Sequence, residues 1–265
     1  MTDAKISFRN VSRRYPMRGT EFVALGGVSL DVADGEFVTI VGPSGCGKST
    51  LLNICAGLDE PSGGQVTVDD VPVRGPSPQR GVIFQQYALF PWLTVRRNVE
   101  FGLRLAKLSA AERRRRAEQA IELVGLTKFA DALPKTLSGG MKQRCAIARA
   151  YAVDPSILLM DEPFGALDAL TRVALQDQLL ATWSADQRTV LFITHDVDEA
   201  VYLGNRVVVL AAGPGRIDRI VDVDLPYPRT EQIRLSPEFA ALRGEVWRAV
   251  YHQPGAKAPD QRTSA

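Results

Sequence analysis

Short runs of hydrophobic residues, spaced for strands, occupy the first third of this 265-residue chain. Residues 5–15 (KISFRNVSRRY) alternate apolar and polar positions, which is typical of a half-buried strand. Residues 28–42 predict two strands joined by a turn at Asp34–Gly35, and the second of them, Glu36 to Val41, leads into a glycine-rich loop. The stretches GQVTVDD and RGVIFQ predict two further short strands.

The pattern becomes helical between Thr94 and Asp154. One helix there begins at Ser109 and Glu112, which have capping-box spacing, and ends by Gly125. Strand patterns return in SILLMDEP, RTVLFITHD and NRVVVLAAG, whose all-apolar runs suit strands buried on both faces of a parallel sheet. The sequence therefore predicts an α/β fold with a mainly parallel sheet, an N-terminal antiparallel β part and a helical insert.

These elements predict one large domain over about residues 5–225. Its core covers about residues 5–85 and 155–225, and a helical subdomain covers about residues 86–154. Prolines and charges become frequent over residues 226–265, where we expect a peripheral helix, around Pro237 to Val250, and a loose tail.

Composition and charge narrow the class of protein. The formal net charge of +2 is too weak to predict nucleic acid as a partner. No apolar run approaches the roughly 18 residues that a membrane span requires, and the first ten residues lack a secretion signal. The three cysteines, Cys46, Cys55 and Cys145, have no C-x-x-C spacing, which favours a reducing compartment.

The stretch GPSGCGKST fits the phosphate-loop pattern G-x-x-x-x-G-K-[ST]. Its glycines let backbone N–H groups approach phosphate oxygens, and the start of the following helix adds the positive end of its dipole. Lys48 supplies charge for the β- and γ-phosphates, and the Ser49 hydroxyl can ligate Mg²⁺. The alternative is a chance glycine turn, which the strand–loop–helix context disfavours. The candidate phosphate-binding residues are Gly42, Pro43, Ser44, Gly45, Cys46, Gly47, Lys48, Ser49 and Thr50.

Two acidic residues end the apolar strand in SILLMDEP. Asp161 is expected beside the phosphate loop, where it would hold Mg²⁺ through water. Glu162 is better placed to accept a proton from the attacking water. The alternative is an ordinary acidic strand end.

A second glycine-opened helix start occurs far from the first, in LSGGMKQR. Ser138 sits where an N-cap belongs, and Gly139 and Gly140 leave the first helical N–H groups bare, which makes another anion site. One chain could hardly fold both sites onto the same nucleotide. We therefore expect a head-to-tail dimer that clamps each ATP between Lys48 of one chain and Ser138 of the other.

These motifs, in this order and with His195 after a strand, resemble the ABC ATPase family over about residues 5–225. The resemblance implies ATP and Mg²⁺ as cofactors and assigns four further roles. Gln85 would sense Mg²⁺ and the attacking water, and His195 would lie near the γ-phosphate. Asp168 would act across the dimer, and Tyr15 would stack on adenine. The implied metal-binding residues are then Ser49, Gln85 and Asp161, and the implied catalytic residues are Glu162, His195 and Gln85.

Three of these four roles have a simpler alternative. Tyr15 could be a strand-end tyrosine, and Asp168 could merely cap the next helix. His195 precedes Asp196 and Glu199 in a cap-like spacing, so it could simply mark a helix entrance. Two positions depart from the family pattern: Met141 in the signature and GALD around Asp168. Neither affects the proposed anion sites, because those sites use backbone N–H groups.

An aromatic loop, residues 90–93 (FPWL), follows Gln85 closely. It could receive a helix from a membrane partner, or it could fill a small core within the insert. The arginine run at residues 113–116 predicts a solvated helix face rather than a lipid-headgroup patch.

The stretches around this loop and after His195 resemble ATPases of the nitrate/sulfonate/taurine importer group. That resemblance implies a separate membrane permease, an indirect role for a substrate-binding protein, and a peripheral location on the cytoplasmic side of the inner membrane. The cargo would be a small anion such as nitrate, taurine or another sulfonate.

Other classes of ABC ATPase remain as alternatives. An exporter subunit and a cytosolic ATPase in assembly work have similar size. A DNA-repair or chromosome ATPase would need long coiled coils before the signature, where this chain has only a short insert without heptads. A translation-factor type would carry two cassettes, and a P-loop kinase would leave LSGGMKQR without a role.

Overall fold

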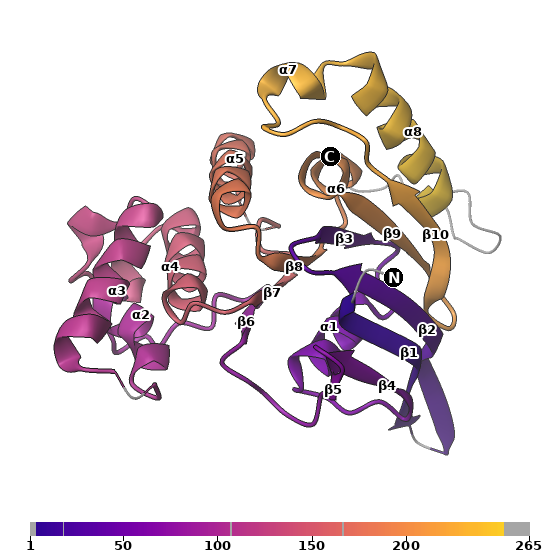
Figure 1. The fold of residues 1–265 in the computed structure, drawn as a ribbon, viewed down its shortest axis with the longest axis horizontal. Coiled ribbons are helices and arrows are strands. Elements are labelled where there is room, and N and C mark those ends of the chain that lie inside the picture. Colours follow the sequence, from indigo (N-terminus) through magenta and orange to yellow (C-terminus); the bar gives the residue numbers. More distant parts are fainter. Residues whose placement is uncertain (1–3, 18, 107, 166, 252–265) are drawn as a thin grey trace.

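The computed structural model describes residues 4–17, 19–106, 108–165 and 167–251. Two sheets pack around one helix, and a group of helices extends to one side (Figure 1). The loose tail expected at the end of the chain lies outside the described residues.

An antiparallel sheet forms the N-terminal part of the chain, with strand order β2-β1-β4-β5. In β1, Ile6 and Phe8 alternate into the interior, and Val11 is buried after a register shift. Its strands are β1 (Ala4–Met17), β2 (Thr20–Ala33), β4 (Gly63–Val68) and β5 (Val71–Pro72).

The second sheet has the order β10-β9-β3-β8-β7-β6 and is parallel except for the β10–β9 pair. Its central strands β3 and β8 are buried at every position, because both faces of the sheet are covered. The strands are β3 (Phe37–Val41), β6 (Arg80–Ile83), β7 (Ile157–Asp161), β8 (Thr189–Ile193), β9 (Arg206–Ala211) and β10 (Arg216–Asp222). The predicted fold class, mainly parallel with an antiparallel β part, is confirmed.

Helix α1 (Lys48–Ala56) is sandwiched between the two sheets, and its apolar side chains join one buried cluster with residues of both. The other face of the parallel sheet is covered by three helices and a short α-helical turn. These are α5 (Ala169–Asp186), α6 (Val197–Leu203), α7 (Glu231–Arg234) and α8 (Pro237–Tyr251).

The helical lobe, residues 95–152, lies at the left of Figure 1. It contains α2 (Val95–Leu103), α3 (Ala110–Leu123) and α4 (Gly139–Ala152), with short 3₁₀ turns at Thr127–Phe129 and Pro134–Thr136. Residues of all three helices join the buried cluster that also contains the second face of the sheet. The lobe is therefore packed onto the core, and Ser138 is the N-cap of its α4.

The expected capping box of α3 is half right. Ser109 is the N-cap and accepts a hydrogen bond from the Glu112 N–H at 3.1 Å. The Glu112 carboxylate does not return to Ser109: it pairs with Arg115 and Arg116 at 2.7 and 2.9 Å. Those ion pairs lower the pKa of Glu112 to about 2, and they show the arginine run as a paired, solvated helix face.

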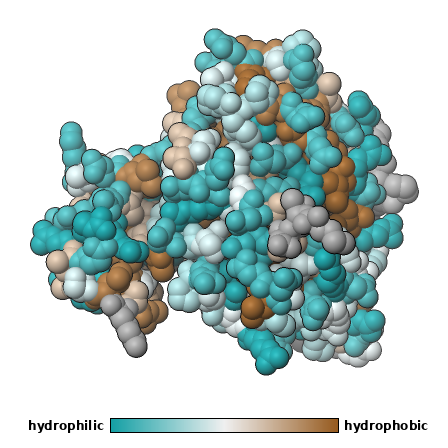
Figure 2. All heavy atoms as spheres, viewed as in Figure 1, coloured by the Kyte–Doolittle hydropathy of each residue, from teal (hydrophilic) through white to brown (hydrophobic). Residues whose placement is uncertain are grey.

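Figure 2 shows a mostly hydrophilic face with hydrophobic atoms gathered on the helical lobe and beside α8. Within the described ranges, no helix combines the length and apolar character needed to cross a membrane.

Candidate nucleotide-hydrolysis site

The phosphate loop, residues 42–50, connects the end of β3 to the start of α1. A Cβ on Gly42 would lie 2.4 Å from the carbonyl oxygen of Leu210, so the chain passes too close to β9 for a side chain. Gly47 has a φ of 95° and caps α1 without a side-chain hydrogen bond. The loop therefore presents backbone N–H groups at a helix N-terminus, as an anion site requires.

Lys48 lies inside this loop and is only 7% exposed. Its Nζ donates hydrogen bonds to the carbonyl oxygens of Gly42 at 2.8 Å and Pro43 at 3.1 Å. The loop thus wraps around the ammonium group, which places a positive charge where the backbone N–H groups gather.

Ser49 joins the loop to the end of β7. Its hydroxyl donates to Asp161 Oδ1 at 3.1 Å. Burial raises the pKa of Asp161, and the neighbouring Glu162 raises it further, while the Ser49 hydrogen bond and the Lys48 charge act against both. A hydroxyl and a carboxylate side by side are oxygen ligands of the kind that Mg²⁺ prefers, so these residues fit that ion.

Glu162 occupies the next position, with a φ of 45° that is unusual for a residue other than glycine. Its N–H donates to the Ile193 carbonyl at 3.0 Å, which ties the end of β7 to the end of β8. Gln85 Nε2 donates to Glu162 Oε2 at 3.2 Å, and His195 Nδ1 lies 3.1 Å from the same oxygen.

These three residues come from neighbouring strands of one sheet. Gln85 follows β6, Glu162 follows β7 and His195 follows β8, and all three strands are parallel. Their carboxyl ends meet at one sheet edge, which is where ligands bind in open α/β sheets. The structure therefore brings the three predicted catalytic residues together.

Ser138 lies in the helical lobe as the N-cap of α4, accepting from the Met141 N–H at 3.3 Å. Asp168 is the N-cap of α5 and accepts from the Thr171 N–H at 3.0 Å, a bond that lowers the pKa of Asp168. A Cβ on Gly140 would lie 3.0 Å from Thr171 Cγ2, so the two helix starts are neighbours. In Figure 1, α4 lies in the helical lobe, away from α1, which lies between the two sheets.

Comparisons with known proteins agree with this arrangement. The family model described as ABC transporter matches residues 25–165. A protein of Brucella abortus that is named as an ATP-binding protein is 72% identical over 94% of each chain. The chain belongs to the ABC transporter family.

Two further comparisons describe relatives of this ABC ATPase. The bicarbonate transport ATP-binding protein CmpC of Synechococcus elongatus is 47% identical over 91% of this chain, which covers 37% of CmpC. A solved ATP-binding cassette, dimeric and bound to ADP and Pi after hydrolysis, has a TM-score of 0.76. It is 37% identical and matches 83% of this chain and 100% of its own. The resemblance to ABC ATPases is confirmed: the chain is the ATP-binding, ATP-hydrolysing subunit of a transporter.

The predicted adenine contact of the ABC ATPase, Tyr15, lies near the end of β1. Its hydroxyl donates to Asp59 Oδ2 at 2.6 Å, and Arg13 covers its ring at 4.6 Å from the centroid. Asp59 follows the C-terminal end of α1, whereas Lys48 begins that helix. These contacts hold Tyr15 at the opposite end of α1 from the phosphate loop, and its stacking on adenine stays a prediction.

The aromatic loop of this ABC ATPase, residues 90–93, lies at the surface. Pro91 and Trp92 are exposed, and Phe90 and Leu93 are half-buried. Trp92 is 71% exposed, and Phe90 packs between Trp92 and Phe101 at centroid distances of 5.8 and 4.4 Å. Asn98, which is fully buried, bonds to the Phe90 N–H and to the carbonyls of Phe90 and Leu93. The sequence interpretation missed Asn98, because its partners are backbone groups that leave no sequence pattern.

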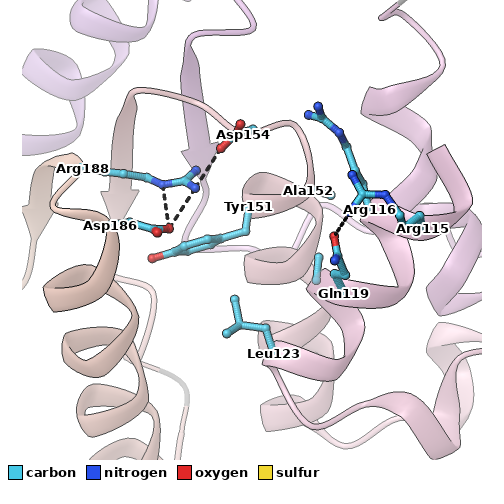
Figure 3. Close-up of a pocket in the computed structure, with 10 residues that line it drawn as sticks. Arg115, Arg116, Gln119, Leu123, Tyr151, Ala152, Asp154, Asp186 and Arg188 are labelled. Carbon is cyan, nitrogen blue, oxygen red and sulfur yellow. Dashed lines mark hydrogen bonds and ion pairs between the residues drawn. The ribbon is translucent and has the colours of Figure 1, made fainter. Parts of the chain in front are cut away.

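A separate cavity of about 400 Å³ lies between α3, the end of α4 and the start of β8 (Figure 3). Its charged groups already have partners, some within the lining and some outside it: Arg115 and Arg116 pair with Glu112, which does not line the cavity. Arg188 reaches Asp154 and Asp186 at 2.8 and 2.9 Å, and Arg115 donates to Gln119 at 3.1 Å. Neither the phosphate loop nor Glu162 lines this cavity, so it is not part of the hydrolysis site.

Proposed function

We propose that this ATPase powers the import of a small anion, such as nitrate, taurine or another sulfonate, through a separate membrane permease. The observation that carries the proposal is the similarity to CmpC, which is named for the transport of another small anion, bicarbonate. The sequence resemblance to the nitrate/sulfonate/taurine importer group points in the same direction.

In the proposed hydrolysis step, Glu162 accepts a proton from the water that attacks the γ-phosphate. Gln85 and His195 both reach Glu162 Oε2, so they hold its carboxylate in one orientation. Lys48 offsets the charge of the β- and γ-phosphates. Ser49, Gln85 and Asp161 are the residues that would hold Mg²⁺, which when bound neutralises phosphate charge.

We further propose that the active form is a head-to-tail dimer. Ser138, Gly139 and Gly140 of one chain would close over the ATP on the phosphate loop of the other. Asp168 would act at the same interface, since its helix start neighbours that of α4. The support is that the similar solved cassette is dimeric with ADP and Pi bound.

The aromatic loop is the proposed docking point for the permease. Trp92, at 71% exposed, precedes α2, and Leu105, at 83% exposed, follows α2, so both are available to a partner. A partner helix that covers them would bury large apolar groups, the usual anchors of an interface. The chain would then sit peripherally on the cytoplasmic side of the inner membrane, with the substrate-binding protein contacting only the permease.

A pull-down tests this function. A tagged Glu162→Gln chain, which should hold ATP without turning it over, is purified from detergent-solubilised membranes with ATP and Mg²⁺, and its partners are identified by mass spectrometry. A many-span permease together with a substrate-binding protein supports import. A permease recovered without a substrate-binding protein indicates an exporter, and soluble partners alone indicate assembly work.

A further inference from the structure

Arg229 lies between β10 and α7, in a stretch to which the sequence assigns no role, and it is only 6% exposed. Its guanidinium donates hydrogen bonds to backbone carbonyls from two parts of the chain. Nη1 donates to Val201, Tyr202 and Gly204 at 3.0, 2.7 and 2.8 Å, and Nη2 donates to Val223 and Leu225 at 3.5 and 3.4 Å.

Among the described residues, no carboxylate forms an ion pair with Arg229. Burial lowers the pKa of Arg229 accordingly. Its compensation is the C-terminal end of α6, where unpaired carbonyls and the negative end of the helix dipole favour a cation. An apolar side chain in this place would leave these buried carbonyl oxygens without their donor. The planar guanidinium binds several carbonyls at once, and its rigid geometry fixes their positions relative to one another.

The helix that Arg229 holds is short and begins beside the hydrolysis site. α6 has seven residues, from Val197 to Leu203, and its N-cap Asp196 directly follows His195. His195 is itself 63% exposed on its side chain, and its described hydrogen bond is the one to Glu162 at 3.1 Å. Packing therefore does little to hold the imidazole, and its position depends on where α6 begins.

A second contact from the same stretch reaches the first turn of α6. Arg234 donates to Gln176 Oε1 at 2.7 Å, and Gln176 Nε2 donates to Glu199 Oε1 at 2.8 Å. Gln176 and Glu199 are buried, on α5 and α6 respectively. α6 is thus held at its first turn through Gln176 and at its last turn by Arg229.

We propose that Arg229 is a positioning residue for ATP hydrolysis, which acts by fixing α6 so that His195 stays against Glu162. This inference rests on the proposed role of His195. It makes Arg229 part of the hydrolysis machinery, although its guanidinium hydrogen-bonds to the carbonyls around α6 and β10 and not to Glu162 or His195.

The test is a kinetic cycle on the purified full-length chain with Mg-ATP, using Arg229→Met, His195→Ala and the double variant. We expect Arg229→Met to lower kcat by about tenfold to a hundredfold, the scale of a small misplacement near reacting atoms, with KM for ATP within about threefold of wild type. In the His195→Ala background, the same substitution should lower kcat by less than about twofold, since the imidazole through which it acts is gone.

Two further variants separate positioning from folding. Arg243→Met is the control, because Arg243 also reaches α6, through Asp198 at 3.5 Å, but both side chains are half exposed. It should keep the wild-type rate. Arg229→Lys keeps the charge and part of the hydrogen bonding, so its kcat should lie between those of wild type and Arg229→Met. If Arg229→Met does not fold, Arg229→Lys takes its place in the cycle.

Losses that multiply in the double variant would overturn the inference, because Arg229 would then act independently of His195. A wild-type kcat in Arg229→Met, with His195→Ala slow, overturns the positioning role alone and leaves the proposed function standing. A wild-type rate in His195→Ala overturns the proposed role of His195, and the positioning role with it.

Discussion

The Glu162 carboxylate meets an amide and an imidazole at one oxygen because three parallel strands end side by side. Gln85 and His195 lie far from it in sequence, but strand order makes them neighbours. A carboxylate held in this way, with its side chain 19% exposed, is suited to take a proton from a positioned water.

Replacing the Glu162 carboxylate tests its proposed role as the base most directly. Glu162→Gln keeps the shape and the Gln85 contact but removes the proton acceptor. Hydrolysis should fall by roughly two to four decades, while ATP binding persists. Phosphate release and nucleotide binding are measured on the purified chain, with Glu122→Gln, an exposed residue of α3, as the control. Near-normal turnover in Glu162→Gln would show that another group is the base.

Glu199 is a second acidic residue, and its buried environment predicts how the stability of the protein depends on pH. Burial raises its pKa from the ordinary value of 4.5, and the charge of Asp196 raises it further. Hydrogen bonds from Thr194 and Gln176 and the charge of Arg172 act in the opposite direction. The folded chain thus holds this proton more tightly than the unfolded chain does, so ionised Glu199 lowers stability as pH rises above about 4.5.

Glu199→Gln should therefore stabilise the protein at neutral and alkaline pH and make little difference in acid. The glutamine can still accept the hydrogen bond from Gln176. Thermal unfolding at pH 5 and pH 8 measures this, and the gain in Tm over wild type should be larger at pH 8. A gain that is equal at both values would mean that ionisation of Glu199 does not limit stability.

At the scale of elements, local sequence chemistry predicts where helices and strands begin, because the signals lie within a few residues. Ser109, Ser138 and Asp168 are all N-caps in the structure. The Glu112 side chain was mispredicted because two arginines one turn ahead attract it more than the Ser109 N–H does. Asn98 and Arg229 could not be predicted, since each binds backbone carbonyls that every residue carries.

The aromatic loop exposes a large apolar side chain, Trp92, which we propose is covered by the permease. Trp92→Ala should change the free energy of unfolding by no more than about 0.5 kcal/mol, because the side chain is already 71% exposed. It should weaken binding to permease-containing membranes by about 30-fold or more, the loss of roughly 2 kcal/mol expected of an aromatic anchor.

Co-sedimentation with inverted membrane vesicles measures this loss, alongside ATP binding in solution. Trp247→Ala is the matched control: Trp247 is 50% exposed on α8, remote from the loop. If Trp92→Ala still binds membranes and unfolds more easily, the loop is a small core and not a docking point.

At the scale of the whole molecule, motif order predicts the fold class and most of the candidate site. The phosphate loop and the acidic strand end are joined within one chain by the Ser49–Asp161 contact. Ser138 is different, because α4 and α1 lie in separate parts of the molecule (Figure 1). We propose that this second helix start binds the nucleotide of a partner chain, which would explain its distance from α1.

Mixing two inactive chains tests that assembly. Lys48→Ala removes the charge inside the phosphate loop, and Ser138→Arg blocks the helix start. In a head-to-tail dimer, a pair made of one chain of each kind keeps one intact site, formed by Lys48 of the Ser138→Arg chain and Ser138 of the Lys48→Ala chain. Light scattering should then detect ATP-dependent dimers in the mixture and none in either variant alone. If Ser138→Arg dimerises by itself as readily as wild type does, then Ser138 does not contact the nucleotide of a partner chain, and ATP is bound within one chain.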